Sequence, residues 1–128
     1  MSNLRVYLAE GLGTFILILF GCGAVHSATL TGAQSGLWQV AIVWGMGVAL
    51  AAYSVGGVSG AHINPAMTIA QAVWGRFCWT KVVPYIVVQL TGAIVAAAVL
   101  FVVYGPSLRQ KEEAMGVKRG RSEEHTSE

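Results

Sequence analysis

The sequence predicts an all-α membrane protein with three spanning helices and one short re-entrant helix. Of its 128 residues, 55% are hydrophobic and only 11% are charged, and the mean hydropathy of +0.61 lies above the range usual for soluble domains. The charges are also segregated, since no Asp, Glu, Lys or Arg occurs between Glu10 and Arg76. A second uncharged run separates Lys81 from Arg109. Apolar runs of this length are typical of segments that cross a bilayer.

The first spanning helix is expected over about residues 6–25, which matches the roughly 20 residues that such a helix needs. It contains Gly11, Gly13, Gly21 and Gly23. Glycines weaken a soluble helix, but in a membrane small residues let helices approach closely. Glu10 is unusual here, because a carboxylate inside a spanning helix is costly unless it has partners. It is therefore a candidate functional residue.

Two further spans and one shorter helix are expected after an uncharged polar connector at residues 26–36. The second span covers about residues 37–55, and the third covers about residues 82–104. Between them, an apolar helix over about residues 65–74 is too short to cross a bilayer. We therefore expect this short helix to enter the membrane and leave it on the same side.

Residues 56–68 hold the most informative pattern in the chain. They open with Gly56 and Gly57, which we expect to be too flexible for a helix interior. A helix start follows, with Asn64 as the N-cap and Pro65 at the first helical position. At membrane depth the first amides of this helix and the carbonyls before it cannot remain unpaired in lipid, so they must face protein or a wet path. The positive end of the helix dipole then points inward, which suits a channel for neutral polar solutes.

The eight residues 59–66, Ser-Gly-Ala-His-Ile-Asn-Pro-Ala, resemble the first Asn-Pro-Ala signature of the major intrinsic proteins, the aquaporins and glycerol facilitators. Residues 9–15 resemble the opening of that family's first helix. The resemblance covers residues 4–105 and implies the first inverted repeat of the aquaporin-like fold. It also implies that a second repeat, with its own Asn-Pro-Ala, completes the pore.

The same resemblance implies a role for Glu10. In the family, the glutamate at this place accepts hydrogen bonds from backbone amides of the re-entrant loop. The alternative is a glutamate near the end of a spanning helix whose carboxylate reaches interfacial water.

The expected path needs hydrogen-bond groups that replace those of water. The predicted pore and substrate-binding residues are Asn64, Pro65, Ala66, Trp44, Gly60, Ala61 and His62. The backbone carbonyls of residues 60–62 supply acceptors if this approach is extended. The side-chain oxygen of Asn64 is expected to bind amides of the first helical turn, which leaves its NH2 group as a donor toward the lumen. The ring of His62 either lines the path or packs against backbone, and the sequence favours neither.

The prediction of the substrate depends on Trp44. When the motif is aligned, it falls at the family's constriction, where glycerol facilitators carry tryptophan and water-selective members a smaller aromatic. A tryptophan face offers an apolar wall for the CH groups of a polyol. The alternative is that Trp44 faces lipid or a neighbouring helix. We expect the other three tryptophans, Trp38, Trp74 and Trp79, to be interfacial anchors.

The predicted function is a passive channel for glycerol and other small uncharged solutes, with water. A water-selective aquaporin half is the nearest alternative, and a non-conducting helical membrane-association module is the alternative of another class. The chain has no aspartate, and its three histidines and two cysteines are scattered, so we expect no enzyme, no metal site and no cofactor. Cys22 and Cys78 are expected to lie toward opposite faces and to form no disulfide.

The predicted organisation has three parts. Residues 1–105 form the first half of a channel domain, residues 106–120 begin a polar extramembrane connector, and residues 121–128 resemble a translated sequencing adapter and are expected to be non-native. The expected location is the plasma membrane, as a multi-pass protein, with the N-terminus in the cytoplasm because Arg76 and Lys81 follow the second span. The basic residues after 105 oppose that orientation. The expected partners are lipid, the missing second half and, by the resemblance, a homotetramer of the full-length protein; the net charge of +2 does not indicate nucleic acid.

Overall fold

A computed structural model describes residues 3–34 and 36–117 of the chain. Within these residues the elements are, in order, α1 (Asn3–His26), η1 (Ser27–Thr31), α2 (Leu37–Ser59), α3 (Pro65–Val73), η2 (Trp79–Lys81) and α4 (Val82–Met115). The stretches that contain α1, α2 and α4 are long and apolar enough to cross a membrane. The predicted all-α membrane fold with three spanning helices and one short helix is confirmed.

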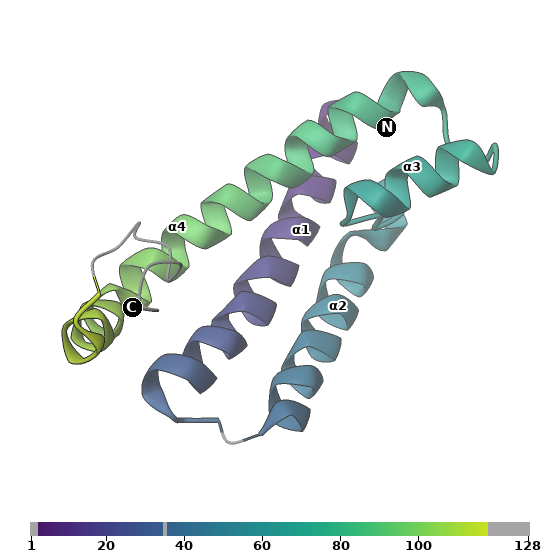
Figure 1. The fold of residues 1–128 in the computed structure, drawn as a ribbon. Coiled ribbons are helices and arrows are strands. Elements are labelled where there is room, and N and C mark those ends of the chain that lie inside the picture. Colours follow the sequence, from purple (N-terminus) through teal and green to yellow (C-terminus); the bar gives the residue numbers. More distant parts are fainter. Residues whose placement is uncertain (1–2, 35, 118–128) are drawn as a thin grey trace, which may run out of the picture.

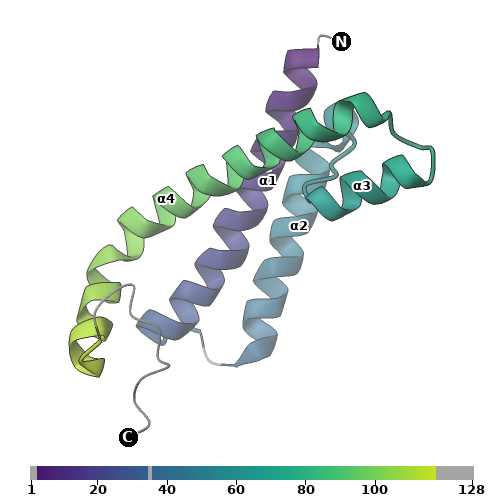
Figure 2. The same cartoon turned by 45° about the horizontal axis from the view of Figure 1, so that its top comes forward.

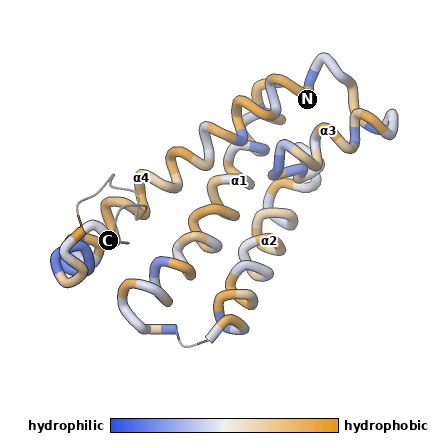
Figure 3. The backbone as a smooth tube through the Cα atoms, viewed as in Figure 1, coloured by the Kyte–Doolittle hydropathy of each residue, from blue (hydrophilic) through white to orange (hydrophobic). Residues whose placement is uncertain are grey.

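The helix α1 lies between α2 and α4 and packs against both, as Figures 1 and 2 show from two directions. The short helix α3 lies beside the first part of α4. Hydrophobic residues run along the three long helices, while hydrophilic residues gather at the last turns of α4 (Figure 3). Many large apolar side chains on the outer faces are exposed, including Leu8, Tyr53 and Ile94. Such an outer surface fits contact with lipid or with further protein.

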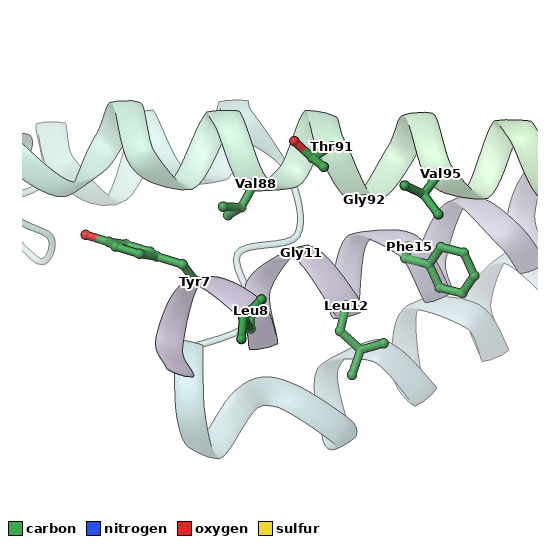
Figure 4. A pocket seen from close by; sticks show the side chains of 9 residues that line it. All are labelled: Tyr7, Leu8, Gly11, Leu12, Phe15, Val88, Thr91, Gly92 and Val95. Carbon is green, nitrogen blue, oxygen red and sulfur yellow. The ribbon is translucent and has the colours of Figure 1, made fainter. Parts of the chain in front are cut away.

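Two glycines bring α1 and α4 together. A Cβ atom added at Gly92 would lie 2.2 Å from the carbonyl oxygen of Gly11, and one added at Gly11 would lie 3.1 Å from the carbonyl oxygen of Val88. The separation at Gly92 leaves no room for a side chain, and that at Gly11 is tight, as expected for small residues in membrane helices. A shallow groove beside this contact is lined mainly by apolar side chains and by the Thr91 hydroxyl, and its lining residues are drawn in Figure 4.

The second span is longer than predicted. We expected Gly56 and Gly57 to lie outside the helix, and this prediction was wrong, because α2 continues to Ser59. A glycine inside a helix costs only about 1 kcal/mol, which packing can offset. The helix ends instead at Gly60, whose φ of 86° is left-handed and whose N–H donates to the Gly56 carbonyl at 3.0 Å. This is the usual glycine cap of a helix C-terminus.

The third span also continues beyond its predicted end at residue 104. The helix α4 runs through Pro106 to Met115, although a proline removes one backbone hydrogen bond from a helix. Most residues at positions 108–115 are good helix formers, and the Nζ of Lys111 donates to the carbonyl of Thr29 at 2.5 Å. Part of the predicted connector at 106–120 is therefore helical. Residues 118–128, which include the suspected adapter segment, lie outside the described residues.

Candidate pore segment

The loop between α2 and α3 reaches into the bundle. The backbone N–H of Ile63 donates to Oε1 of Glu10 in α1. Glu10 is seven residues beyond the first residue of α1, so at 1.5 Å per residue it lies about 10 Å along that helix. The nine residues of α3 span about 13 Å and return to the end of the bundle at which α1 and α4 begin (Figure 1). The helix α3 therefore begins inside the bundle and ends at its surface.

The start of α3 has the predicted geometry. Asn64 is extended at φ −156° and ψ 129°, its Oδ1 accepts a hydrogen bond from the N–H of Ala66 at 2.8 Å, and Pro65 opens the helix. This is a side-chain N-cap. Asn64 is exposed, and its Nδ2 group has no hydrogen-bond partner among residues 3–34 and 36–117. The NH2 group is thus exposed and available to donate a hydrogen bond.

The backbone before Asn64 is turned instead of extended. Gly60, Ala61 and Ile63 have φ values of 86°, 48° and 44°, which residues other than glycine rarely adopt. We expected an extended backbone to present the carbonyls of residues 60–62, and the expectation of an extended backbone was wrong. The turned conformation is stabilised because the Ser59 hydroxyl accepts the N–H of Ala61 at 3.1 Å and Glu10 accepts that of Ile63.

The acceptors themselves remain available. From the residues that the structure describes, the carbonyl oxygens of Gly60, Ala61 and His62 receive no hydrogen bond. They follow one another along the chain and directly precede the Asn64 amide. The segment thus presents consecutive acceptors and then one donor.

A cluster of buried polar side chains forms hydrogen bonds with this loop. Glu10 and Thr68 are 0% exposed and Gln89 is 1% exposed. The Nε2 of Gln89 donates to Oε1 of Glu10 at 2.9 Å and to Oγ1 of Thr68 at 3.0 Å. Thr68 in turn donates to the carbonyl of Asn64 at 3.2 Å. Glu10 therefore contacts both the loop and α4, and its side chain is fully buried.

Aromatic side chains hold the ring of His62 on the inner side of the loop. Its ring centre lies 4.7 Å from that of Phe77 and 5.2 Å from that of Tyr85, and its Nδ1 lies 3.1 Å from Oγ1 of Thr68. The hydroxyl of Tyr85 donates to the carbonyl of Ser59 at 2.7 Å. Of the two roles considered for His62, this geometry favours packing by the ring.

Trp44 lies apart from this cluster. It is 15 residues before the end of α2, which places it about 22 Å along the helix from Ser59. Its side chain is half-buried and lies against Gly21 of α1. The structure therefore brings the loop residues, Glu10 and α3 together, and places Trp44 at another level of the same half-molecule.

Gln89, Thr68 and Tyr85 are the site residues that the sequence analysis missed. Gln89 carried a signal, because it is a lone amide within the uncharged run 82–104, and polar groups inside spanning helices usually have a specific role. Thr68 and Tyr85 are common residue types in membrane helices and carried none.

Outside the membrane-length helices, the connector from α3 to α4 holds one reactive group. The exposed thiol of Cys78 lies 3.1 Å from the hydroxyl of Thr80, and this hydrogen bond, with the nearby Lys81 charge, lowers the pKa of Cys78 below its ordinary value. Cys22 is half-buried in α1, and neither cysteine forms a disulfide. In the described part of the chain, no group of three or more His, Cys, Asp or Glu residues is arranged to hold a metal ion.

Comparison with known proteins places these features in context. The family model described as major intrinsic protein matches residues 1–126. The glycerol uptake facilitator protein of Haemophilus influenzae is 46% identical over 116 residues, which are 91% of this chain and 44% of that protein. A propanediol uptake facilitator from Citrobacter freundii is 42% identical over 113 residues, 88% of this chain and 42% of its own length. The X-ray structure of the aquaglyceroporin from Plasmodium falciparum matches with a TM-score of 0.77 and 28% identity, over 85% of this chain and 45% of that one. The chain thus spans less than half the length of these relatives.

Proposed function

The chain belongs to the major intrinsic protein family, and from this premise we propose that it is the first half of a passive membrane channel for glycerol and similar small uncharged solutes, with water. The names of two relatives, a glycerol and a propanediol uptake facilitator, support short polyols as the solute class. The observation that carries the proposal is the segment 60–64, whose three carbonyls and Asn64 NH2 group have no hydrogen-bond partner among the residues that the structure describes.

The proposed conduction follows from these groups. A hydroxyl of the solute donates to the carbonyls of Gly60, Ala61 and His62 in turn, and the Asn64 NH2 group donates to a solute oxygen. Each bond replaces one that the solute made to water, so the solute passes without a deep energy well. The positive N-terminal end of α3 opposes the passage of cations. Because Glu10 and Gln89 fix the loop, these groups keep their positions as solutes pass.

Trp44 is proposed as one wall of the constriction. Its indole face is apolar and can contact the CH groups of a polyol. Water has no CH groups, so a tryptophan here favours a polyol. The missing second half supplies the opposing wall and the second Asn-Pro-Ala motif. We also infer the plasma membrane as location, a cytoplasmic N-terminus and a tetrameric full-length channel.

The proposal is tested on the full-length protein that carries this half, reconstituted in liposomes and measured by stopped-flow light scattering. Glycerol and water permeabilities should both exceed those of empty liposomes. Trp44→Phe should lower the ratio of glycerol to water permeability by about tenfold, as a changed contact in a tight site does. Trp38→Phe is the matched control, because Trp38 is 65% exposed and lies near the start of the same helix. It should leave the ratio unchanged.

Other outcomes select the alternatives. Water flux without glycerol flux would establish the water-selective channel. A full-length protein that conducts neither solute would favour the membrane-association module.

A further inference from the structure

The indole of Trp44 lies flat on the backbone of α1 at Gly21. A Cβ atom built on Gly21 would lie 2.6 Å from each of Cδ2, Cε2 and Cε3 of Trp44. All three atoms belong to the six-membered ring, and a point equally distant from three atoms of a regular hexagon lies on the axis through its centre. The ring therefore presents its face, and not its edge, to the space that a side chain at position 21 would need.

The two residues differ in what surrounds them. Gly21 is buried, whereas Trp44 is only half-buried. Because one face of the indole is against α1, the exposed part of the ring lies on the side turned away from α1. The backbone of α1 thus sets how far the ring extends from the α1–α2 contact.

We propose that Gly21 determines the specificity of the channel by setting the position of the Trp44 ring. The inference rests on the proposed function, in which Trp44 forms a wall of the path. Gly21 does not touch the solute; it is a positioning residue that acts through Trp44.

The consequence of adding one methyl group follows from the distances. Ordinary van der Waals contact begins at 3.4 Å, so a separation of 2.6 Å forces atoms apart. The added carbon is fixed to a helix backbone, whereas the Trp44 ring can turn about its side-chain bonds. The ring must therefore move by about 1 Å away from α1, toward its exposed side and into the path. A narrower path obstructs glycerol more than the smaller water molecule.

The test uses Gly21→Ala in the full-length channel in liposomes, with flux normalised to reconstituted protein. Glycerol permeability should fall about tenfold, and water permeability by less than about twofold. In the double variant Gly21→Ala with Trp44→Phe, the smaller ring leaves room for the methyl group. Its glycerol-to-water ratio should return to that of Trp44→Phe alone.

Gly47→Ala is the matched control. Gly47 lies in the same contact between α1 and α2, and a Cβ added there would be 3.0 Å from Cβ of Phe20, but no atom of Trp44 is among its nearest neighbours. It loosens the same helix pair without touching the indole. Its glycerol-to-water ratio should be unchanged, and an equal change in both glycine variants would overturn the proposal.

A spectroscopic measurement separates the contact from the flux. In protein labelled with 5-fluorotryptophan, the ¹⁹F resonance of Trp44, assigned by its loss in Trp44→Phe, should shift in Gly21→Ala and not in Gly47→Ala. An unshifted resonance would overturn the contact, and a shifted resonance with parallel loss of both fluxes would overturn the specificity role. If the unsubstituted channel passes no glycerol, the proposed function fails, and the role of Gly21 in specificity fails with it. The resonance shift in Gly21→Ala would then still show that Gly21 contacts Trp44.

Discussion

The two ends of α3 lie in opposite environments. At its N-terminal end, Thr68 is fully buried and belongs to a hydrogen-bonded cluster with Glu10 and Gln89. Just beyond its C-terminal end, Trp74 is 71% exposed, and Arg76 and Cys78 are exposed as well. The whole helix has only nine residues. The difference shows that the helix is oriented, with its capped and polar end at depth and its other end at the bundle surface.

The difference also predicts how substitutions should act. At the deep end, a polar group that loses its partner cannot turn to water, so its desolvation remains uncompensated. At the surface end, water replaces a lost partner. The effect of removing a hydrogen bond should therefore decrease from the Glu10 cluster toward Cys78.

The largest effect is expected for Glu10→Ala. The substitution removes the acceptor of the Ile63 N–H and of the Gln89 Nε2, and each buried donor without a partner costs about 1–3 kcal/mol. The loop should lose its turned conformation, with a lowered thermal unfolding temperature in detergent and with glycerol and water flux both abolished. Glu10→Gln, which keeps a carbonyl acceptor, should lose less.

The matched control for Glu10 is Glu113→Ala, at an exposed position in the last turns of α4. It removes the same functional group and should leave stability and flux unchanged. If Glu10→Ala were as mild as this control, the deep end of α3 would not depend on the buried carboxylate.

A smaller loss is expected for Gln89→Leu. Leucine keeps the approximate volume but removes both donors, so Thr68 and Glu10 each lose one hydrogen bond, at about 1–3 kcal/mol in total. Glycerol and water flux should fall together, because this residue positions the loop and not the Trp44 ring. Thr91→Val on the same helix is the control, since the exposed Thr91 hydroxyl donates to the Val87 carbonyl of its own helix. A changed glycerol-to-water ratio in Gln89→Leu would contradict the assignment.

The features predicted from the sequence are those with a local physical cause. The three spans follow from uncharged apolar runs, and the start of α3 follows from Asn64 and Pro65, whose capping geometry depends on neighbouring residues only. The contact of Glu10 with the loop came from family resemblance and not from the residues alone. The pore-lining role of Trp44 stays a prediction.

The features that were missed depend on distant contacts. Gln89 is 79 residues from Glu10, and nothing in a lone amide identifies its partner. Ala61 and Ile63 adopt left-handed φ values that their residue types do not indicate, because Ser59 and Glu10 stabilise the turn. Gly21 was visible as a small residue, but the aromatic ring that covers it belongs to another helix.

The smallest effect is expected at the surface end, for Thr80→Val next to Cys78. The Thr80 hydroxyl stabilises the thiolate and lowers the pKa of Cys78, so more of the thiol is ionised near neutral pH. The substitution should raise that pKa, shift the pH profile of alkylation upward and slow the reaction near neutral pH about twofold, because the thiolate is the nucleophile. The measurement is the rate of labelling by a membrane-impermeant maleimide across a pH series, in protein with Cys22→Ser so that one thiol remains. Flux and unfolding temperature should not change. If the maleimide cannot label Cys78 in the membrane, this end of α3 does not lie in water, and the contrast between its two ends fails. If the labelling rate is the same in Thr80→Val, the hydroxyl does not lower the pKa of Cys78.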